Sequence, residues 1–141
     1  MIRIITDSTC EASPEVLRHP AVTVIPLTVV FGHEALRDGV DITREQFWAR
    51  LPSSSPLPST SQAVPSDFDG LFEQFTAAGD EVIAVLISSK LSGTFSSAQI
   101  AYESKPGWPV EIIDSKTTSV GLGLMVQAAV AMVDRGATRD E

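Results

Sequence analysis

The stretch VIAVLISSKLSGTFSSA, residues 82–98, decides the fold class of this 141-residue chain. It opens with an apolar run, continues through a turn of serine, lysine and glycine, and ends in a segment that predicts a helix over 93–102. A short run rich in valine and isoleucine, without polar alternation, is typical of a strand covered on both faces. Strand, polar turn and helix in this order indicate one unit of a parallel α/β sheet.

Three further apolar runs predict strands, at residues 2–5, 22–30 (broken by Pro26) and 110–113. Helices are expected from Pro14, from the capping box Thr43–Gln46 through Leu51, from a cap at Ser66 through Phe75, and over 118–133. The aromatic residues of the Ser66 helix recur at helical spacing, and we expect them to pack in the core. The alternation predicts one layered α/β domain over residues 1–141, with a largely parallel sheet flanked by helices.

The composition excludes several classes of partner. Hydrophobic residues make up 43% and charged residues 20% of the chain, as in a globular domain, and the formal net charge is −8. Nucleic acids and anionic membrane surfaces need a basic patch, so both are excluded as partners. The most apolar stretch, residues 120–133, is too short to span a membrane, which takes about 20 residues. A single cysteine, Cys10, and an N-terminus unlike a signal peptide favour the cytoplasm.

Polar clusters follow three of the predicted strands. They are Asp7–Thr9, Ser88–Thr94 and Asp114–Ser119. The carboxyl ends of parallel strands share one edge of a sheet, where α/β domains bind ligands, so we expect Asp7, Ser92 and Ser115 along that edge. Thr60-Ser61-Gln62 can reach the same edge if the helix after it packs antiparallel to the strands.

The segment Ser92-Gly93-Thr94 is the strongest candidate for a binding site. Gly93 lets the backbone approach a ligand, the two hydroxyls can donate hydrogen bonds, and the following helix presents free amides. Such a place binds an oxyanion. The alternative is that Ser92 only caps its helix, which is a routine role for serine.

The nature of the anion follows from what the sequence contains around it. No Gly-x-x-x-x-Gly-Lys-Ser/Thr loop is present, and the Gly121-x-Gly123 pair has Val126 where the dinucleotide fingerprint needs glycine or alanine. A hydroxyl-rich site without arginine suits a carboxyl group. No cofactor and no metal site is expected, because the two histidines and one cysteine are dispersed along the chain.

Catalysis has little support. His19 and His33 lie near the second predicted strand, away from the polar clusters, so a serine nucleophile has no obvious base. Asp7 lacks the second aspartate, two residues on, that aspartyl-phosphate enzymes carry. A small hydrolase or phosphotransferase using Asp7 or Ser92 remains the alternative to a binding protein without catalytic residues.

Five motifs in order resemble the DegV family. The opening is Ile4–Thr9, and the next block is Pro26-Leu27 with Asp38–Ile42. Thr60-Ser61-Gln62-x-x-Pro65 and Leu86–Ala98 are similar to the signatures of that family. Asp114-Ser115 with Ser119-x-Gly121-x-Gly123 completes the set.

This resemblance implies a bacterial, cytoplasmic lipid-binding protein that carries a long-chain fatty acid and presents it to the catalytic subunit of a fatty acid kinase. It implies that Thr60 and Ser92 hold the carboxyl group, with Ser61, Gly93 and Thr94 beside them, and that a second domain encloses the acyl tail. Family members are longer, and a capping box, Thr138–Glu141, stands at the end of the chain. We therefore expect residues 1–141 to be the N-terminal, head-group-binding domain, with an apolar surface beside Ser92 where the second domain packs.

Overall fold

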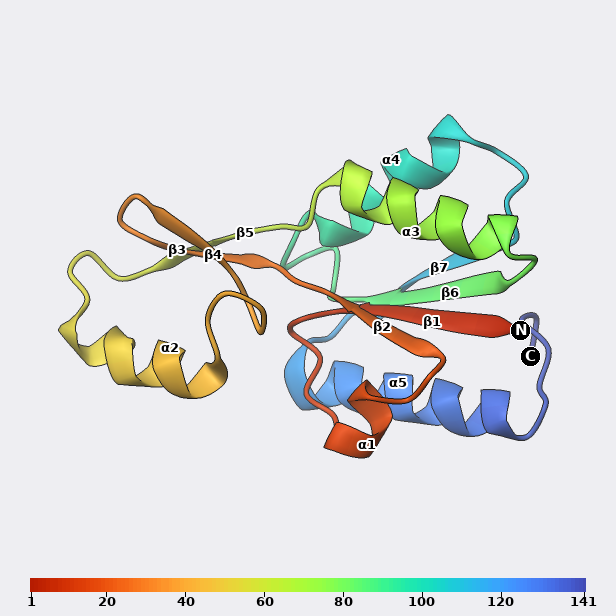
Figure 1. Ribbon diagram of the computed structural model, residues 1–141, viewed down its shortest axis with the longest axis horizontal. Helices are drawn as coiled ribbons and strands as arrows, with labels where there is room; N and C mark the ends of the chain where they lie inside the picture. Colours follow the sequence, from red (N-terminus) through yellow and green to blue (C-terminus); the bar gives the residue numbers. More distant parts are fainter.

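A computed structural model describes every residue from 1 to 141 and divides the chain into two parts. The larger part contains a four-stranded sheet, here called the core sheet, with helices on both faces (Figure 1). The smaller part, residues 28–61, extends away from it and is called the small lobe (Figure 1).

All strands of the core sheet are parallel, in the order β2-β1-β6-β7. Their bounds are β1 Ile2–Asp7, β2 Val22–Ile25, β6 Glu81–Leu86 and β7 Val110–Asp114. The central strands β1 and β6 are almost wholly buried, because helices cover both of their faces. The predicted class, a layered α/β domain with a parallel sheet, is confirmed.

Helices α3 (Pro65–Ala77) and α4 (Thr94–Ser104) cover one face of the core sheet, and α1 (Pro14–Leu17) and α5 (Ser119–Asp134) lie on the other (Figure 1). Alternate residues of each strand therefore enter different cores. Ile5 packs with the phenylalanines of α3, whereas Ile4 packs with Leu122 and Val126 of α5. The aromatic residues of α3 are core residues, as their spacing predicted.

The small lobe is an antiparallel sheet in the order β4-β3-β5, accompanied by α2 and the short 3-10 helix η1. Its bounds are β3 Thr28–Phe31, β4 Glu34–Arg37, α2 Arg44–Arg50, η1 Leu51–Ser53 and β5 Ser59–Ser61. The single strand expected over 22–30 is thus two strands in two sheets. Pro26 has no N–H to donate, so the parallel ladder with β1 stops at Ile25 and the chain turns into the lobe.

The sequence predicted a cap for each of two helices, and the structure confirms one of these caps and contradicts the other. Thr43 and Gln46 form the predicted capping box of α2. The prediction that Ser66 caps α3 is wrong, because α3 begins at Pro65 after Val64, whose N–H donates to Asp67 Oδ2 at 3.1 Å. Proline is preorganised for the first helical position, and it moves the start ahead of the serine.

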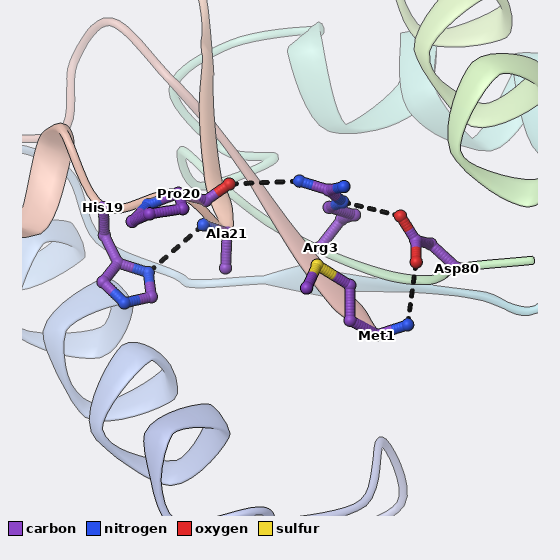
Figure 2. Close-up of polar contacts among 6 residues, drawn as sticks. All are labelled: Met1, Arg3, His19, Pro20, Ala21 and Asp80. Atoms are coloured by element: carbon purple, nitrogen blue, oxygen red, sulfur yellow. Dashed lines mark hydrogen bonds and ion pairs between the residues drawn. The ribbon is translucent and has the colours of Figure 1, made fainter. Parts of the chain in front are cut away.

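Ion pairs connect residues at the amino edge of the core sheet (Figure 2). The terminal amino group of Met1 and the guanidinium of Arg3 each donate to Asp80, at 2.7 Å. Both hydrogen bonds lower the pKa of Asp80 below its ordinary value, and the bond from the amino group has the larger effect. His19 lies at this edge too, where its Nδ1 accepts from the N–H of Ala21 at 3.2 Å (Figure 2).

Candidate ligand site

The carboxyl ends of β1, β6 and β7 form one edge, called here the exit rim. Because these strands are parallel neighbours, Asp7, which ends β1, lies at the same rim as Ser92 and Ser115, which follow β6 and β7, as predicted. Backbone hydrogen bonds join the turns of the rim: Ser88 N donates to Thr117 O at 2.9 Å, and Ser115 N to Leu86 O at 3.1 Å.

Asp7 has a structural role at the rim. Its Oδ2 accepts from the N–H of Ile87 at 2.7 Å, and its Oδ1 accepts from both the N–H and the hydroxyl of Thr9, at 3.0 and 2.6 Å. The side chain is fully buried. A carboxylate with both oxygens committed to donors and no face open to solvent is poorly placed to act as a nucleophile.

Asp114 joins the turns after β6 and β7. It accepts from the hydroxyl of Ser89 at 2.6 Å, from the N–H of Ser89 at 3.1 Å and from the N–H of Lys116 at 3.0 Å. The hydroxyl bond is the main reason that the pKa of Asp114 lies below its ordinary value. This carboxylate thus holds the rim turns in register beside Ser92.

Ser92 and Thr94 form a pair of hydroxyl groups at the start of α4. Their oxygens are 2.9 Å apart, and Ser92 Oγ also accepts from the N–H of Thr94 at 3.2 Å. The serine therefore does cap the helix in part. Two hydroxyls carry two protons, and the bond between them uses one. If the buried Thr94 donates to Ser92, the half-buried Ser92 keeps its proton for a ligand.

Gln62, the residue after the Thr60-Ser61 strand, contacts the start of α4 between and beyond these two hydroxyls. Its Nε2 donates to Ser97 Oγ on α4 at 3.2 Å. Its side-chain amide also lies so close over Gly93 that a Cβ there would overlap Gln62 Oε1. Gln62, whose part the sequence did not reveal, thus contacts the start of α4 at Gly93 and Ser97. The signal that could have found it is the glycine before α4, which admits a close neighbour.

Thr60 and Ser61 are both exposed residues of β5, and neither caps a helix. Thr60 lies in a cleft of about 610 Å³ between the exit rim and the small lobe. Its wall combines the turn Ser8–Glu11 with apolar residues of both parts, among them Pro26, Val29, Phe47 and Trp48. Ser92 is not in that wall, and Leu91 beside it is 64% exposed. The predicted convergence of Thr60 and Ser92, and the apolar patch next to Ser92, stay predictions.

A carboxylate also bridges the two parts at the cleft. Glu11 accepts from the guanidinium of Arg44 on α2 and from the hydroxyl of Ser119 at the start of α5, both at 3.0 Å. The backbone of Glu11 lies against α5 at Gly123, where a Cβ would overlap the Glu11 carbonyl oxygen. The Gly-x-Gly pattern is therefore explained by close chain packing.

The two histidines lie away from the rim. His19 is at the amino edge, with Nε2 3.2 Å from Asp134 Oδ1, and His33 is an exposed residue of the turn between β3 and β4. None of the helices combines the length and the apolar character that a membrane crossing requires.

The fold and the rim define a class of protein: a parallel α/β domain that carries neutral hydroxyls and the first amides of a helix at the carboxyl edge of its sheet. A model of the DegV family, described as uncharacterised proteins, matches residues 1–141. The chain is 36% identical over 140 residues to a DegV domain-containing protein of Clostridium perfringens and 38% identical over 135 residues to one of Deinococcus radiodurans. The chain belongs to the DegV family.

Solved structures agree with this assignment. A stearic-acid-binding protein from Eubacterium ventriosum is similar with a TM-score of 0.90 at 34% identity, over 99% of this chain and 50% of that one. A fatty-acid-binding DegV family protein from Thermus thermophilus is similar with a TM-score of 0.88 at 32% identity, over 99% and 49%. Against the Clostridium and Deinococcus proteins the coverage is 99% and 96% of this chain, and 50% and 48% of theirs. The chain thus spans about half the length of the relatives that it matches.

Proposed function

We propose that this chain is the head-group-binding half of a fatty-acid-binding DegV protein, in which Thr60 and Ser92 hold the carboxyl group. The observation that carries the proposal is the Ser92–Thr94 hydroxyl pair at the start of α4, the helix that Gln62, next to Thr60 and Ser61, contacts through Ser97. The fatty acids named for the similar proteins support the same ligand class.

A carboxylate that leaves water must recover hydrogen bonds, and each good donor to a charged acceptor contributes about 1.5–3 kcal/mol. The free proton of the hydroxyl pair, the hydroxyl of Thr60 and the first amides of α4 together supply such donors. Ser61, Gly93 and Thr94 shape the same place. The apolar acyl chain gains roughly 0.8 kcal/mol for each methylene buried, and a second domain would complete its enclosure.

The test is lipid retention by the full-length protein. The double variant Thr60→Ala, Ser92→Ala should retain much less fatty acid than wild type after purification, as measured by mass spectrometry of extracted lipid. Its thermal melt should stay close to that of wild type. Ser96→Ala is the matched control, because Ser96 is an exposed serine of α4 two residues beyond the pair. Unchanged retention in the double variant, with an unchanged melt, would exclude these residues as the carboxyl site.

We further propose that the full-length protein acts as a carrier without catalytic residues of its own and presents the carboxyl group to a separate fatty acid kinase in the bacterial cytoplasm. A neutral hydroxyl site supports this, because it holds the carboxylate without a general base near it. Mixing the loaded protein with a purified kinase subunit and ATP should give an acyl phosphate. The protein alone should not hydrolyse generic esters or phosphate esters. Ester turnover that Ser92→Ala abolishes would favour the hydrolase alternative instead.

A further inference from the structure

The charges of this acidic protein are distributed unevenly along the chain, which carries 18 acidic and 10 basic side chains. Residues 82–102, which include most of β6, the turn after it and most of α4, contain a single charged residue, Lys90. Residues 115–133, which include the turn after β7 and nearly all of α5, also contain a single one, Lys116. Both lysines lie in turns of the exit rim, so these two long segments contribute only positive charge, and they contribute it at the rim.

The side chains of Lys90 and Lys116 are exposed and form no ion pair. Six of the ten lysines and arginines form ion pairs with carboxylates, and the four that do not are Arg18, Lys90, Lys116 and Arg135. Arg18 and Arg135 belong to the amino edge, because their chain neighbours His19 and Asp134 lie 3.2 Å apart there. The exit rim therefore holds both unpaired lysines, which we call the rim lysines.

The carboxylates beside the rim lysines already have hydrogen-bond donors. Asp114 Oδ1 accepts from the N–H of Ser89 and from that of Lys116, so a single oxygen joins the two turns that carry the lysines. Asp7 is buried, and both of its oxygens accept hydrogen bonds. Helices α4 and α5 begin at this edge too, and their first amides add partial positive charge. An anion that approaches the rim from solvent therefore meets exposed positive charge.

We propose that the rim lysines attract the anionic head group of the ligand to the exit rim and so accelerate its association. That this ligand is a fatty acid rests on the proposed function. A net charge of −8 repels a carboxylate, and the screening length is about 8 Å at physiological ionic strength. Two unpaired ammonium groups near Ser92 lower this repulsion where the carboxylate must arrive. Local fields of this kind raise association rates more than they strengthen the bound complex.

Stopped-flow binding to delipidated full-length protein tests the role of the rim lysines. The probe is a fluorescent fatty acid below its micelle concentration, and the fluorescent fatty alcohol of the same chain is the uncharged control. The double variant Lys90→Gln, Lys116→Gln should bind the acid about three- to tenfold more slowly than wild type at low ionic strength. At about 1 M salt, where the screening length is about 3 Å, most of this difference should vanish. The alcohol should bind both proteins at the same rate.

The matched control is the double variant Arg18→Gln, Arg135→Gln, which changes the net charge equally but removes unpaired cations from the amino edge. It should bind the acid at nearly the wild-type rate. Equal slowing in both double variants would overturn the proposal, because net charge alone would then be responsible. An unchanged association rate in the lysine variant would overturn it too, as would a rise in the dissociation rate alone. A wild-type protein that binds the alcohol but not the acid would contradict the proposed function, and the role of the lysines with it.

Discussion

The side-chain amide of Gln62 lies directly over Gly93, in the space that the Cβ of any other residue would occupy. The two residues are 31 positions apart in the chain: Gln62 directly follows the last strand of the small lobe, and Gly93 precedes α4. This packing holds the residue that follows β5 against the glycine between Ser92 and Thr94.

Gly93→Ala should displace the amide of Gln62 and break its hydrogen bond to Ser97. Because the displaced group is the flexible end of a side chain, the thermal melt should change little. The affinity of the full-length protein for fatty acid should fall about two- to tenfold. This decrease corresponds to the loss of one hydrogen bond that contributes about 0.5–1.5 kcal/mol. Titration with a fluorescent fatty acid measures it. In a Gln62→Ala background, Gly93→Ala should have no further effect, and an undiminished loss there would contradict this account.

Gly123→Ala should destabilise the fold by roughly 3 kcal/mol. The added methyl group would overlap the backbone carbonyl of Glu11, and the backbone cannot move away as a flexible side chain can. Gly70→Ala is the control within a helix. Nothing lies near its Cβ position, so that change should stabilise by about 0.5–1 kcal/mol. Urea unfolding of both variants checks the contrast. A Gly123→Ala protein as stable as wild type would mean that the Glu11 segment does not pack against α5.

Because of Asp80, the stability of the fold should decrease as the pH is lowered in the acid range. Its folded pKa is lowered by Met1 and Arg3, so its contribution is present above the unfolded value of about 3.9 and is lost as pH falls through the folded pKa. Asp80→Asn should therefore lower the melting temperature at pH 7, and the difference from wild type should shrink as the pH is taken below about 4. Glu103→Gln, at an exposed residue of α4, should show no such trend. A difference that stays constant with pH would argue against the ion pairs.

Trp48 should report on the acyl chain, because it lines the cleft beside Thr60 and is 61% exposed. Adding fatty acid to delipidated full-length protein should shift the emission of Trp48 to shorter wavelength. The spectral difference between wild type and Trp48→Phe isolates this signal. Trp108 packs against Phe72 beside the core, so Trp108→Phe should leave the shift intact. A shift that persists in Trp48→Phe would locate the tail away from the small lobe.

Much of the core sheet could be predicted from the sequence. Strands β1 and β6 are short runs rich in valine and isoleucine that helices cover on both faces, and such strands leave a clear pattern in the sequence. The run Val110–Asp114 of the edge strand β7 has a similar composition. Their shared direction then placed the polar turns at one edge. The position of the exit rim could therefore be predicted from the local strand patterns together with the parallel direction of the strands.

The antiparallel sheet of the small lobe could not be predicted, although helix α2 beside it was. Strand β5 is Ser59-Thr60-Ser61, exposed throughout, and its pairing with β3 depends on partners 29 to 33 residues away. A three-residue polar segment carries no periodicity that distinguishes a strand from a loop. The role of Gln62 was missed for the same reason, since only the fold brings it to Gly93.

The small lobe joins the core at two neighbouring crossings, Pro26-Leu27 on the way out and Gln62-Ala63 on the way back. Two adjacent connections would allow the small lobe to rotate about the line that joins them. Thr60 lies on the lobe side of this axis, and Ser92 lies on the side of the core sheet. In the proposed site, a bound carboxylate would add an attachment off that axis, besides the exposed ion pair of Glu11 and Arg44. Part of the binding free energy would then be spent on ordering the lobe, so loaded and unloaded protein would differ in lobe mobility more than in the structure of the core sheet.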